Sequence, residues 1–208
     1  MERMRKNYST DFDYHTQRNN VHVPFASCNR TSMVMAFKQA RWPVPFDGRQ
    51  EEDAVYEDIF NTEEAKNKQA ELAPWSLGEY PPDQVHVVLE WGFNKWVGQD
   101  ADTFSANARA ADLLITLESG GGVVLSGRFP RPGATHDMGH IVSLAGYVML
   151  DASSEIVRWI VDDPYGDWHS NYTDAKGNNI DFTLPEFERI FDRGDGKYYA
   201  HMIRRYSA

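Results

Sequence analysis

The apolar positions after residue 28 recur every three or four residues, as they do along one face of a helix. They predict a helix that begins near Cys28 with Ser27 as its N-cap. The helix is expected to end before Pro43, because a residue that precedes proline is disfavoured in helical geometry. Residues 1–26 show no such period and predict an irregular or extended segment. The positions that carry the helical period are Met33, Val34, Phe37 and Ala40.

The middle of the chain also favours helix. The acidic, alanine-containing stretch over 44–74 predicts two short exposed helices. Pro81 and Pro82 favour the start of another helix, which Gly92 is expected to end. A further helix is predicted over 103–117, where apolar residues again recur at helical spacing.

The period changes at Gly120, where glycine-flanked apolar runs predict strands. Short turns join several of these runs, so neighbouring strands are expected to be antiparallel. Helices followed by an antiparallel sheet make an α+β fold, which we expect to be one domain over 1–208 with a helical insertion at about 44–117. The expected strands cover 120–129, 140–150, 155–162, 179–182 and 198–204, and a helix over 184–191 follows Thr183.

Composition narrows the class of protein. The chain has 208 residues of which 41% are hydrophobic, enough to bury a core. Its formal net charge of −10 disfavours nucleic acid as a partner, because such binding depends on basic residues. We expect no transmembrane segment and no signal peptide, since no long apolar run is present. The protein is therefore expected to be cytoplasmic as synthesised, and action on a cell wall would need a non-standard release.

The sequence contains one cysteine, Cys28, which limits its chemistry. An intramolecular disulfide and a zinc site with two thiolates are both excluded. A lone cysteine is often a small buried hydrophobic residue, but it is also the pattern of a nucleophile whose histidine lies elsewhere in the chain. The start of a helix favours the nucleophile, because the positive end of the helix dipole stabilises a thiolate.

His140 and Asp163 are expected to be neighbours. His140 opens one predicted strand and Asp163 follows the next, and an antiparallel pair joined by a short turn brings these ends together. Asp163 can then accept the second ring N–H of His140 and fix the orientation of the imidazole. The alternatives are a structural histidine, the same role played by Asp162, and a simple turn formed by the two aspartates before Pro164.

Gln17 lies upstream of the cysteine and carries an amide donor. Its side chain and the backbone N–H of Cys28 would form an oxyanion hole when the thiolate attacks a carbonyl, although an ordinary surface glutamine fits the sequence too. His136 and Asp137 lie near His140, but a glycine-proline loop precedes them and no helix aligns them. We therefore expect no metal and no organic cofactor.

Four segments resemble the double-glycine (bacteriocin-processing) peptidase family of papain-like cysteine peptidases. The family's nucleophile helix is similar to SCNRTSMVMAF, and its oxyanion glutamine segment to YHTQRNN. Its histidine strand is similar to GHIVSLAGY, and its acidic turn to IVDDPYGDWHSNY. The resemblance covers the first 40 residues and roughly 120–175, and the segments occur in the family's order.

The resemblance implies a papain-like fold and a free-standing cysteine peptidase in which Cys28, His140, Asp163 and Gln17 hold the family's roles. Free-standing relatives of this type resemble wall-cleaving, endolysin-like enzymes, so the expected partner is a peptide or the peptide part of peptidoglycan. Two alternatives stay open. One is transglutaminase- or deamidase-type acyl transfer at the same triad, and the other is a non-catalytic binding module. The chain departs from most papain-like enzymes in the longer loop between Gln17 and Cys28.

Overall fold

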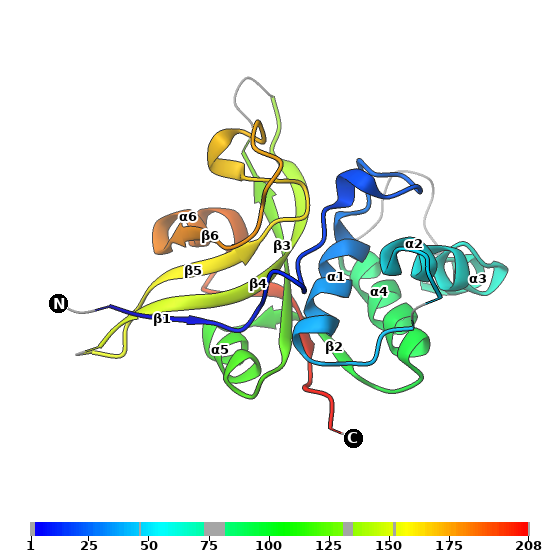
Figure 1. The fold of residues 1–208 in the computed structure, drawn as a ribbon, viewed down its shortest axis with the longest axis horizontal. Coiled ribbons are helices and arrows are strands. Elements are labelled where there is room, and N and C mark those ends of the chain that lie inside the picture. The colour runs from blue at the N-terminus through cyan, green and yellow to red at the C-terminus, as the bar shows by residue number, and fades with distance from the viewer. Residues whose placement is uncertain (1–2, 46, 73–81, 131–134, 152, 208) are drawn as a thin grey trace.

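Two groups of helices pack against the two faces of an antiparallel sheet (Figure 1). The structure is a computed structural model that describes residues 3–45, 47–72, 82–130, 135–151 and 153–207. None of the helices in these ranges has the length and hydrophobicity needed to cross a membrane. The arrangement is α+β, as the sequence predicts.

The described strands form one sheet in the order β2-β7-β3-β4-β5-β6. Strand β4 is long enough to pair with three others, because β3 covers its first half and β1 continues along the same edge, while β5 lies on its other side. All of these pairs are antiparallel. The strands are β1 (Arg3–Asn7), β2 (Asp102–Ala108), β3 (Gly122–Phe129), β4 (Met138–Leu150), β5 (Ile156–Asp162), β6 (Ile180–Thr183) and β7 (Tyr198–Ile203).

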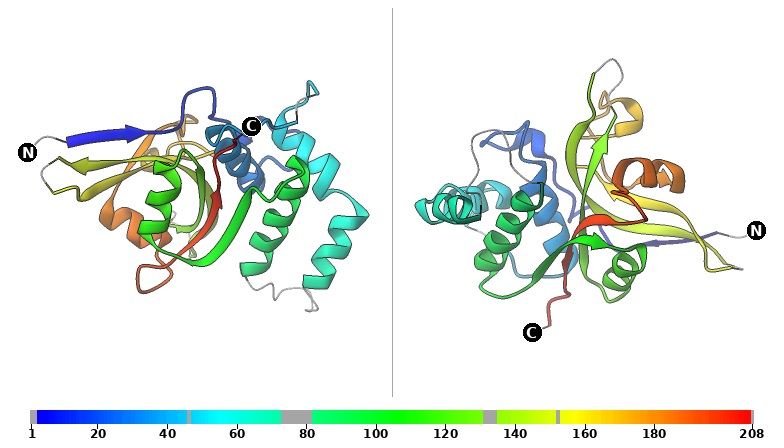
Figure 2. Two further views of the ribbon diagram at one scale, coloured as in Figure 1. Left: turned by 90° about the horizontal axis from the view of Figure 1, so that it is seen from below. Right: turned by 180° about the vertical axis from the view of Figure 1, so that it is seen from behind.

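The helices divide between the two faces of the sheet, as the views from below and from behind show (Figure 2). One face carries α1 and α4 with the short helices between them, and the other carries α5 and α6. The helices on the first face are α1 (Cys28–Gln39), α2 (Glu51–Val55), the π-helix η2 (Tyr56–Phe60), α3 (Glu63–Leu72) and α4 (Pro82–Val97). The others are α5 (Ala110–Glu118) and α6 (Leu184–Phe191), with 3-10 turns η1 (Gln17–Asn19) and η3 (Trp168–Ser170).

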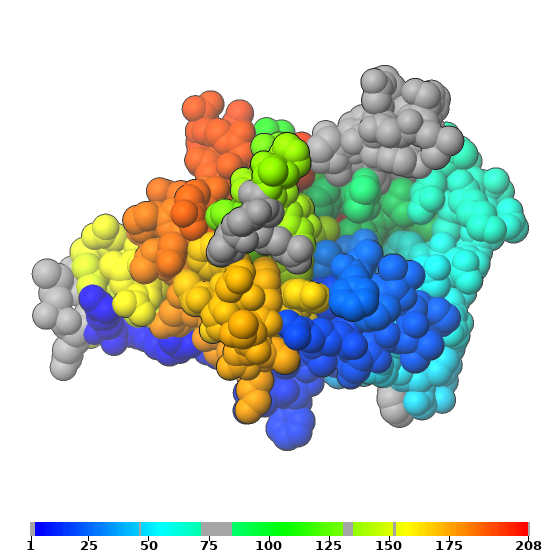
Figure 3. Space-filling view, turned by 90° about the horizontal axis from the view of Figure 1, so that it is seen from above, coloured from blue at the N-terminus to red at the C-terminus, as the bar shows by residue number. Residues whose placement is uncertain are grey.

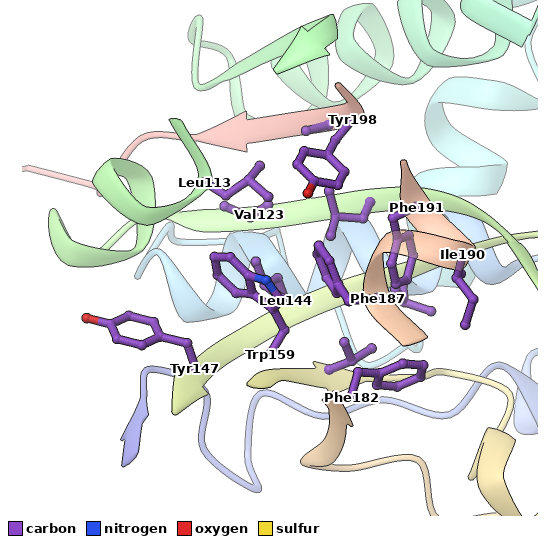
Figure 4. Packing of buried hydrophobic residues seen from close by; sticks show 14 of the residues in the cluster. Leu113, Val123, Leu144, Tyr147, Trp159, Phe182, Phe187, Ile190, Phe191 and Tyr198 are labelled. Atoms are coloured by element: carbon purple, nitrogen blue, oxygen red, sulfur yellow. The ribbon is translucent and has the colours of Figure 1, made fainter. Parts of the chain in front are cut away.

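A first hydrophobic core fills the space under α5 and α6 (Figure 4). Alternate residues of the central strands point into it, since successive strand side chains point to opposite faces. Helix α6 begins where Thr183 and Glu186 satisfy each other's backbone N–H groups in a capping box. The core includes Leu113 and Leu117 from α5, Phe187 and Phe191 from α6, and Val142, Leu144, Trp159 and Val161 from the sheet.

A second core lies between α1, α4 and the opposite face of the sheet. Phe37 of α1 stacks on Phe93 of α4, with ring centroids 5.4 Å apart. Helix α1 also touches the backbone of β3 directly, because any Cβ at Gly122 would collide with the carbonyl of Ala36. Glycine at this position therefore lets the helix that begins at Cys28 lie flush against the sheet.

The structure corrects three of the sequence-based expectations. Residues 102–108 form strand β2 rather than helix, because they pair with β7 and place Phe104 opposite His201. Helix α5 begins only after Arg109, whose N–H donates to Asp112. Gly92 does not end α4 but lies inside it, where the Phe60 ring leaves no room for a side chain.

The N-terminal region contains extended structure, as predicted, since β1 pairs with the second half of β4. The residues of β1 are mostly exposed, so they give no hydrophobic period. The stretch over 44–74 forms two helical segments, as predicted: α2 continued by the π-helix η2, and α3. The first segment is not exposed as expected, because residues 52–55 of α2 are buried. The expectation that Pro81 opens a helix lies outside the described residues.

A buried histidine pair should make folding stability depend on pH. The Nδ1 of His86 lies 3.1 Å from Nε2 of His201, whose Nδ1 lies 2.6 Å from Oδ2 of Asp102. His86 is 3% exposed, and burial, followed by repulsion from His201 and Arg193, lowers its pKa to about 3. The unfolded chain therefore binds a proton between about pH 6.5 and 3 that the folded protein does not bind, so stability falls as pH falls through this window.

We expect His86 to account for a loss of about 2 kcal/mol in unfolding free energy between pH 7 and pH 5. Urea unfolding of the wild type and of His86→Gln at both pH values measures this contribution as the difference between the two pH dependences. His169→Gln, at a partly exposed side chain, is the matched control. An equal pH dependence in wild type and His86→Gln would show that His86 does not carry the effect.

Candidate active site

Cys28 is the first residue of α1 and is partly exposed. The N-terminal end of a helix has free N–H groups and a partial positive charge, which favours a thiolate there. One turn further on, the buried Ser32 hydroxyl donates to the Ile141 carbonyl at 2.9 Å. This bond fixes the start of the helix beside the first residues of β4.

His140 lies in β4 next to this contact and is 4% exposed. Its Nε2 is 2.7 Å from Oδ1 of Asp163, so its other ring nitrogen is the one available to Cys28, whose pKa the imidazole lowers. The edge of the ring packs on Phe129, with centroids 5.1 Å apart. The structure thus brings Cys28, His140 and Asp163, three of the four residues that the sequence singles out, to one place.

The surroundings of the thiol and the imidazole favour the charged form of both. Burial alone would raise the pKa of Cys28, but the hydrogen bond and charge of His140 and the Ile141 N–H outweigh it, so the pKa is lowered. Burial alone would lower the pKa of His140, but the Asp163 carboxylate and Cys28 outweigh it and raise the pKa to about 10. A lowered cysteine pKa beside a raised histidine pKa is what a thiolate–imidazolium pair is expected to show.

Asp163 is fully buried and held in one orientation. Its Oδ1 accepts the Tyr165 N–H at 2.8 Å as well as the His140 ring, and its Oδ2 lies 3.4 Å from the Tyr172 hydroxyl. The Tyr14 hydroxyl donates to the Asp163 carbonyl at 3.1 Å and accepts the Gly177 N–H. These bonds fix the carboxylate so that it can orient the imidazole.

Asp162 points elsewhere although it is the adjacent residue. Its carboxylate accepts the Ser9 hydroxyl at 2.6 Å and the Asn179 N–H at 2.7 Å. Successive strand residues face opposite sides of the sheet, so only one of the two aspartates can share the side of His140. The structure places Asp163 on that side and gives Asp162 a role in joining the N-terminal segment to the loop before β6.

Gln17 lies in η1 and is 1% exposed, so it is not a surface glutamine. Its backbone N–H donates to the Pro164 carbonyl at 2.9 Å, and its Nε2 donates to the Pro24 carbonyl at 2.7 Å. The Ser27 hydroxyl donates to the same Pro24 carbonyl at 3.4 Å. The glutamine is therefore packed between the acidic turn and the residue before the cysteine. One amide hydrogen is used on Pro24 and the second is left for another acceptor.

Sequence reasoning missed two residues that hold this site. Tyr14 joins the acidic turn to the Gly177 backbone, as described above. Asn20 is 5% exposed, and its amide donates to the Ser27 hydroxyl at 2.8 Å and to the Thr31 hydroxyl at 3.1 Å. No pattern in the chain distinguishes either residue, because their partners are distant or lie across a loop.

Among the described residues, His136 and Asp137 do not gather with His140 into a set of potential metal ligands. His136 and Asp137 are exposed, while His140 is buried and bonded to Asp163. Within the described ranges, His15, Glu51 and Glu52 bring potential ligand atoms within 4.8 Å of one another. The Lys38 ammonium already lies there, 2.8 Å from the His15 Nε2 and 3.1 Å from Glu51. This cluster is an ion-pair network whose cation is a lysine.

The described site lies on the face of the molecule where the start of α1 meets the turn after β5. Figure 3 looks onto this face, where the blue N-terminal residues touch the yellow and orange residues that follow β5. A cysteine beside an imidazole at a helix N-terminus, in an α+β fold, is the arrangement that activates a thiol as a nucleophile.

The chain belongs to the Peptidase_C39 like family, whose model matches residues 9–189. This match includes all four residues singled out by the sequence and supports a cysteine peptidase. No curated protein is significantly similar to the chain in sequence.

Proposed function

We propose that this protein hydrolyses peptide bonds through a Cys28–His140–Asp163 triad, in a papain-like form of the α+β fold. The observation that carries the proposal is the buried His140–Asp163 pair, whose Nε2 and Oδ1 lie 2.7 Å apart, beside a cysteine at a helix N-terminus. The thiol and the imidazole are close enough to shift each other's pKa. The lowered pKa of Cys28 increases the share of the attacking thiolate at a given pH.

In the proposed mechanism the Cys28 thiolate attacks the peptide carbonyl, and the carbonyl oxygen becomes an oxyanion. The backbone N–H of Cys28 and the remaining amide hydrogen of Gln17 stabilise this charge. The imidazolium of His140 then gives its proton to the leaving amine, and a thioester to Cys28 remains. Water, deprotonated by His140, attacks the thioester, releases the carboxylic acid and restores the thiolate. Asp163 keeps the imidazole oriented throughout.

The proposed substrate class is a peptide, and the peptide part of bacterial peptidoglycan is the first candidate. The resemblance to wall-cleaving enzymes carries this choice. Mass spectrometry of peptidoglycan fragments and of a peptide library after incubation identifies the bond that is cleaved. An added primary amine separates hydrolysis from acyl transfer, since a transferase would join the amine to the product.

Alkylation tests the proposed nucleophile directly, because Cys28 is the only thiol in the chain. We expect the ratio of the iodoacetamide labelling rates at pH 8 and pH 6 to be smaller for the native protein than for an ordinary thiol, because the pKa of Cys28 is lowered, and labelling to stop peptide hydrolysis. An ordinary thiol, with a pKa near 8.5, would label roughly 80-fold more slowly at pH 6 than at pH 8. The urea-unfolded protein provides that reference. Slow native labelling at pH 6 would mean that Cys28 is a structural thiol.

A further inference from the structure

Three large apolar side chains are exposed in the loop that precedes the nucleophile helix. Val21 is 80% exposed, Val23 is 52% exposed and Phe25 is 83% exposed. We call residues 21–25 the apolar loop. Single exposed apolar residues are common, but three within five positions beside a candidate active site indicate a binding surface.

The backbone of the apolar loop is fixed by α2. The Asp53 carboxylate accepts the N–H of Val21 at 2.9 Å and the N–H of His22 at 3.1 Å. Asp53 itself is 4% exposed, so these bonds are shielded from water. The loop is thus held by a buried charged acceptor, which makes stronger hydrogen bonds than a neutral one.

Side chains of the π-helix and of α1 hold the loop from a second side. The His22 ring lies 5.0 Å from the Tyr56 ring and contacts Glu57 through Nε2 at 2.5 Å. Arg30 donates to the His22 carbonyl at 2.9 Å and lies over the Tyr56 ring at 4.4 Å. The loop between these anchors therefore has a defined shape.

The backbone of Val23 is strained, so the shape of the loop is maintained against a local conformational cost. Its φ of +50° lies in the left-handed region, which a β-branched residue rarely adopts. Such a conformation persists only where the surroundings impose it, and it is frequent at ligand-binding sites. Here it turns the chain so that the Ala26 N–H reaches the Val23 carbonyl at 2.9 Å, while the valine side chain stays exposed.

The apolar loop is continuous with the candidate active site. Its Pro24 carbonyl accepts hydrogen bonds from both Gln17 and Ser27, the residue before the nucleophile. Phe25 precedes Cys28 by three positions, so their Cα atoms lie within about 11 Å of each other. A peptide whose scissile bond lies at the thiol therefore has residues within reach of the loop.

We propose that the apolar loop binds an apolar side chain of the peptide substrate close to the scissile bond, and so determines sequence specificity. This inference rests on the proposed peptidase function. A peptide fits better than an anionic bilayer, because the chain has a net charge of −10 and acidic Asp53 and Glu57 support the loop. The longer loop between Gln17 and Cys28 would then serve to bind the substrate.

The test is cleavage selectivity in the double variant Val21→Ser, Phe25→Ser. A library of peptides that differ only in the residues flanking the cleaved bond compares leucine or phenylalanine with glycine at each position. We expect the wild type to prefer the apolar residue at one position, and the ratio of kcat/KM values to fall at least about tenfold in the variant. The rate of Cys28 alkylation should not change, since iodoacetamide does not need the loop.

Ile115→Ser is the matched control, because Ile115 is 67% exposed and lies on α5, away from the loop. It should leave the selectivity ratio unchanged. An unchanged ratio in the double variant would overturn the inference while the peptidase proposal stands. If the wild type cleaves no peptide and alkylates slowly, the proposed function fails and the inference fails with it.

Discussion

Replacing Cys28 by alanine is expected to abolish peptide hydrolysis, with a loss of about 10⁵-fold or more in kcat. The variant keeps the helix N-terminus, His140 and Gln17, but no atom remains that can form the thioester. Oxyanion stabilisation and substrate binding alone give only residual catalysis over water. Turnover of the best library peptide under saturating conditions measures the loss.

The fold should survive this change. Cys28 is partly exposed and packs only at the margin of the second core, so removing its sulfur is expected to cost about 1 kcal/mol or less of unfolding free energy. Thermal unfolding of the variant checks this. Cys28→Ser is the matched control, because the hydroxyl keeps a hydrogen bond to His140 but is a much weaker nucleophile. Activity that persists in Cys28→Ala would exclude Cys28 as the nucleophile.

Replacing Asp163 by asparagine is expected to slow hydrolysis about 10⁴-fold, less than the loss of His140 in His140→Ala. The carboxylate is a main cause of the raised pKa of His140, so its removal lowers that pKa and weakens the thiolate–imidazolium pair. Iodoacetamide labelling should therefore slow more at pH 6 than at pH 8. Comparing the two rates separates an effect on the pair from a general loss of folded protein.

Asp162→Asn is the control for this experiment. Asp162 is equally buried, but its partners are Ser9 and Asn179 rather than His140. We expect this variant to lose unfolding free energy while the folded protein keeps its alkylation rate at pH 6. The opposite result, with slow labelling in Asp162→Asn and normal labelling in Asp163→Asn, would transfer the orienting role to Asp162.

The sequence predicted the second half of the fold well because its signals are local. Strands β3, β4 and β5 are continuous apolar runs bounded by turns, and the N-cap residue Thr183 indicates the start of helix α6. The start of α1 at Cys28 was also predicted and is confirmed. In each case, neighbouring residues determine the element without help from distant ones.

The incorrect secondary-structure predictions occur where residues distant in the sequence determine the structure. Residues 102–108 become a strand because β7, almost a hundred positions later, offers a pairing edge. Gly92 stays helical, and the Phe60 ring packs against it. Propensity does not contain this information. The description of 44–117 as an insertion into a single domain stays a prediction.

For the site, the sequence predicted which residues meet but left one choice open. The neighbourhood of His140 and Asp163 followed from antiparallel strands and is confirmed by their 2.7 Å contact. Strand alternation distinguishes Asp162 from Asp163. Trp159 and Val161 face the first core, and Asp163, two positions further on, lies on the same side of the sheet. The catalytic roles of these residues and of Gln17 stay predictions. The long-range bonds of Tyr14 had no sequence signal.

The close fit of α1 on β3 at Gly122 has a mechanical consequence. The thiol is carried by a helix of the second core, whereas the imidazole packs on Phe129 of the first core. The distance between the Cys28 thiol and the His140 imidazole is therefore set by how the two separately packed layers pack against each other. A small shift of α1 along the sheet would separate the Cys28 sulfur from the His140 ring while every helix and strand stayed intact. The geometry of the site therefore depends on the interface between the two layers, and it is more sensitive to small displacements than the layers themselves.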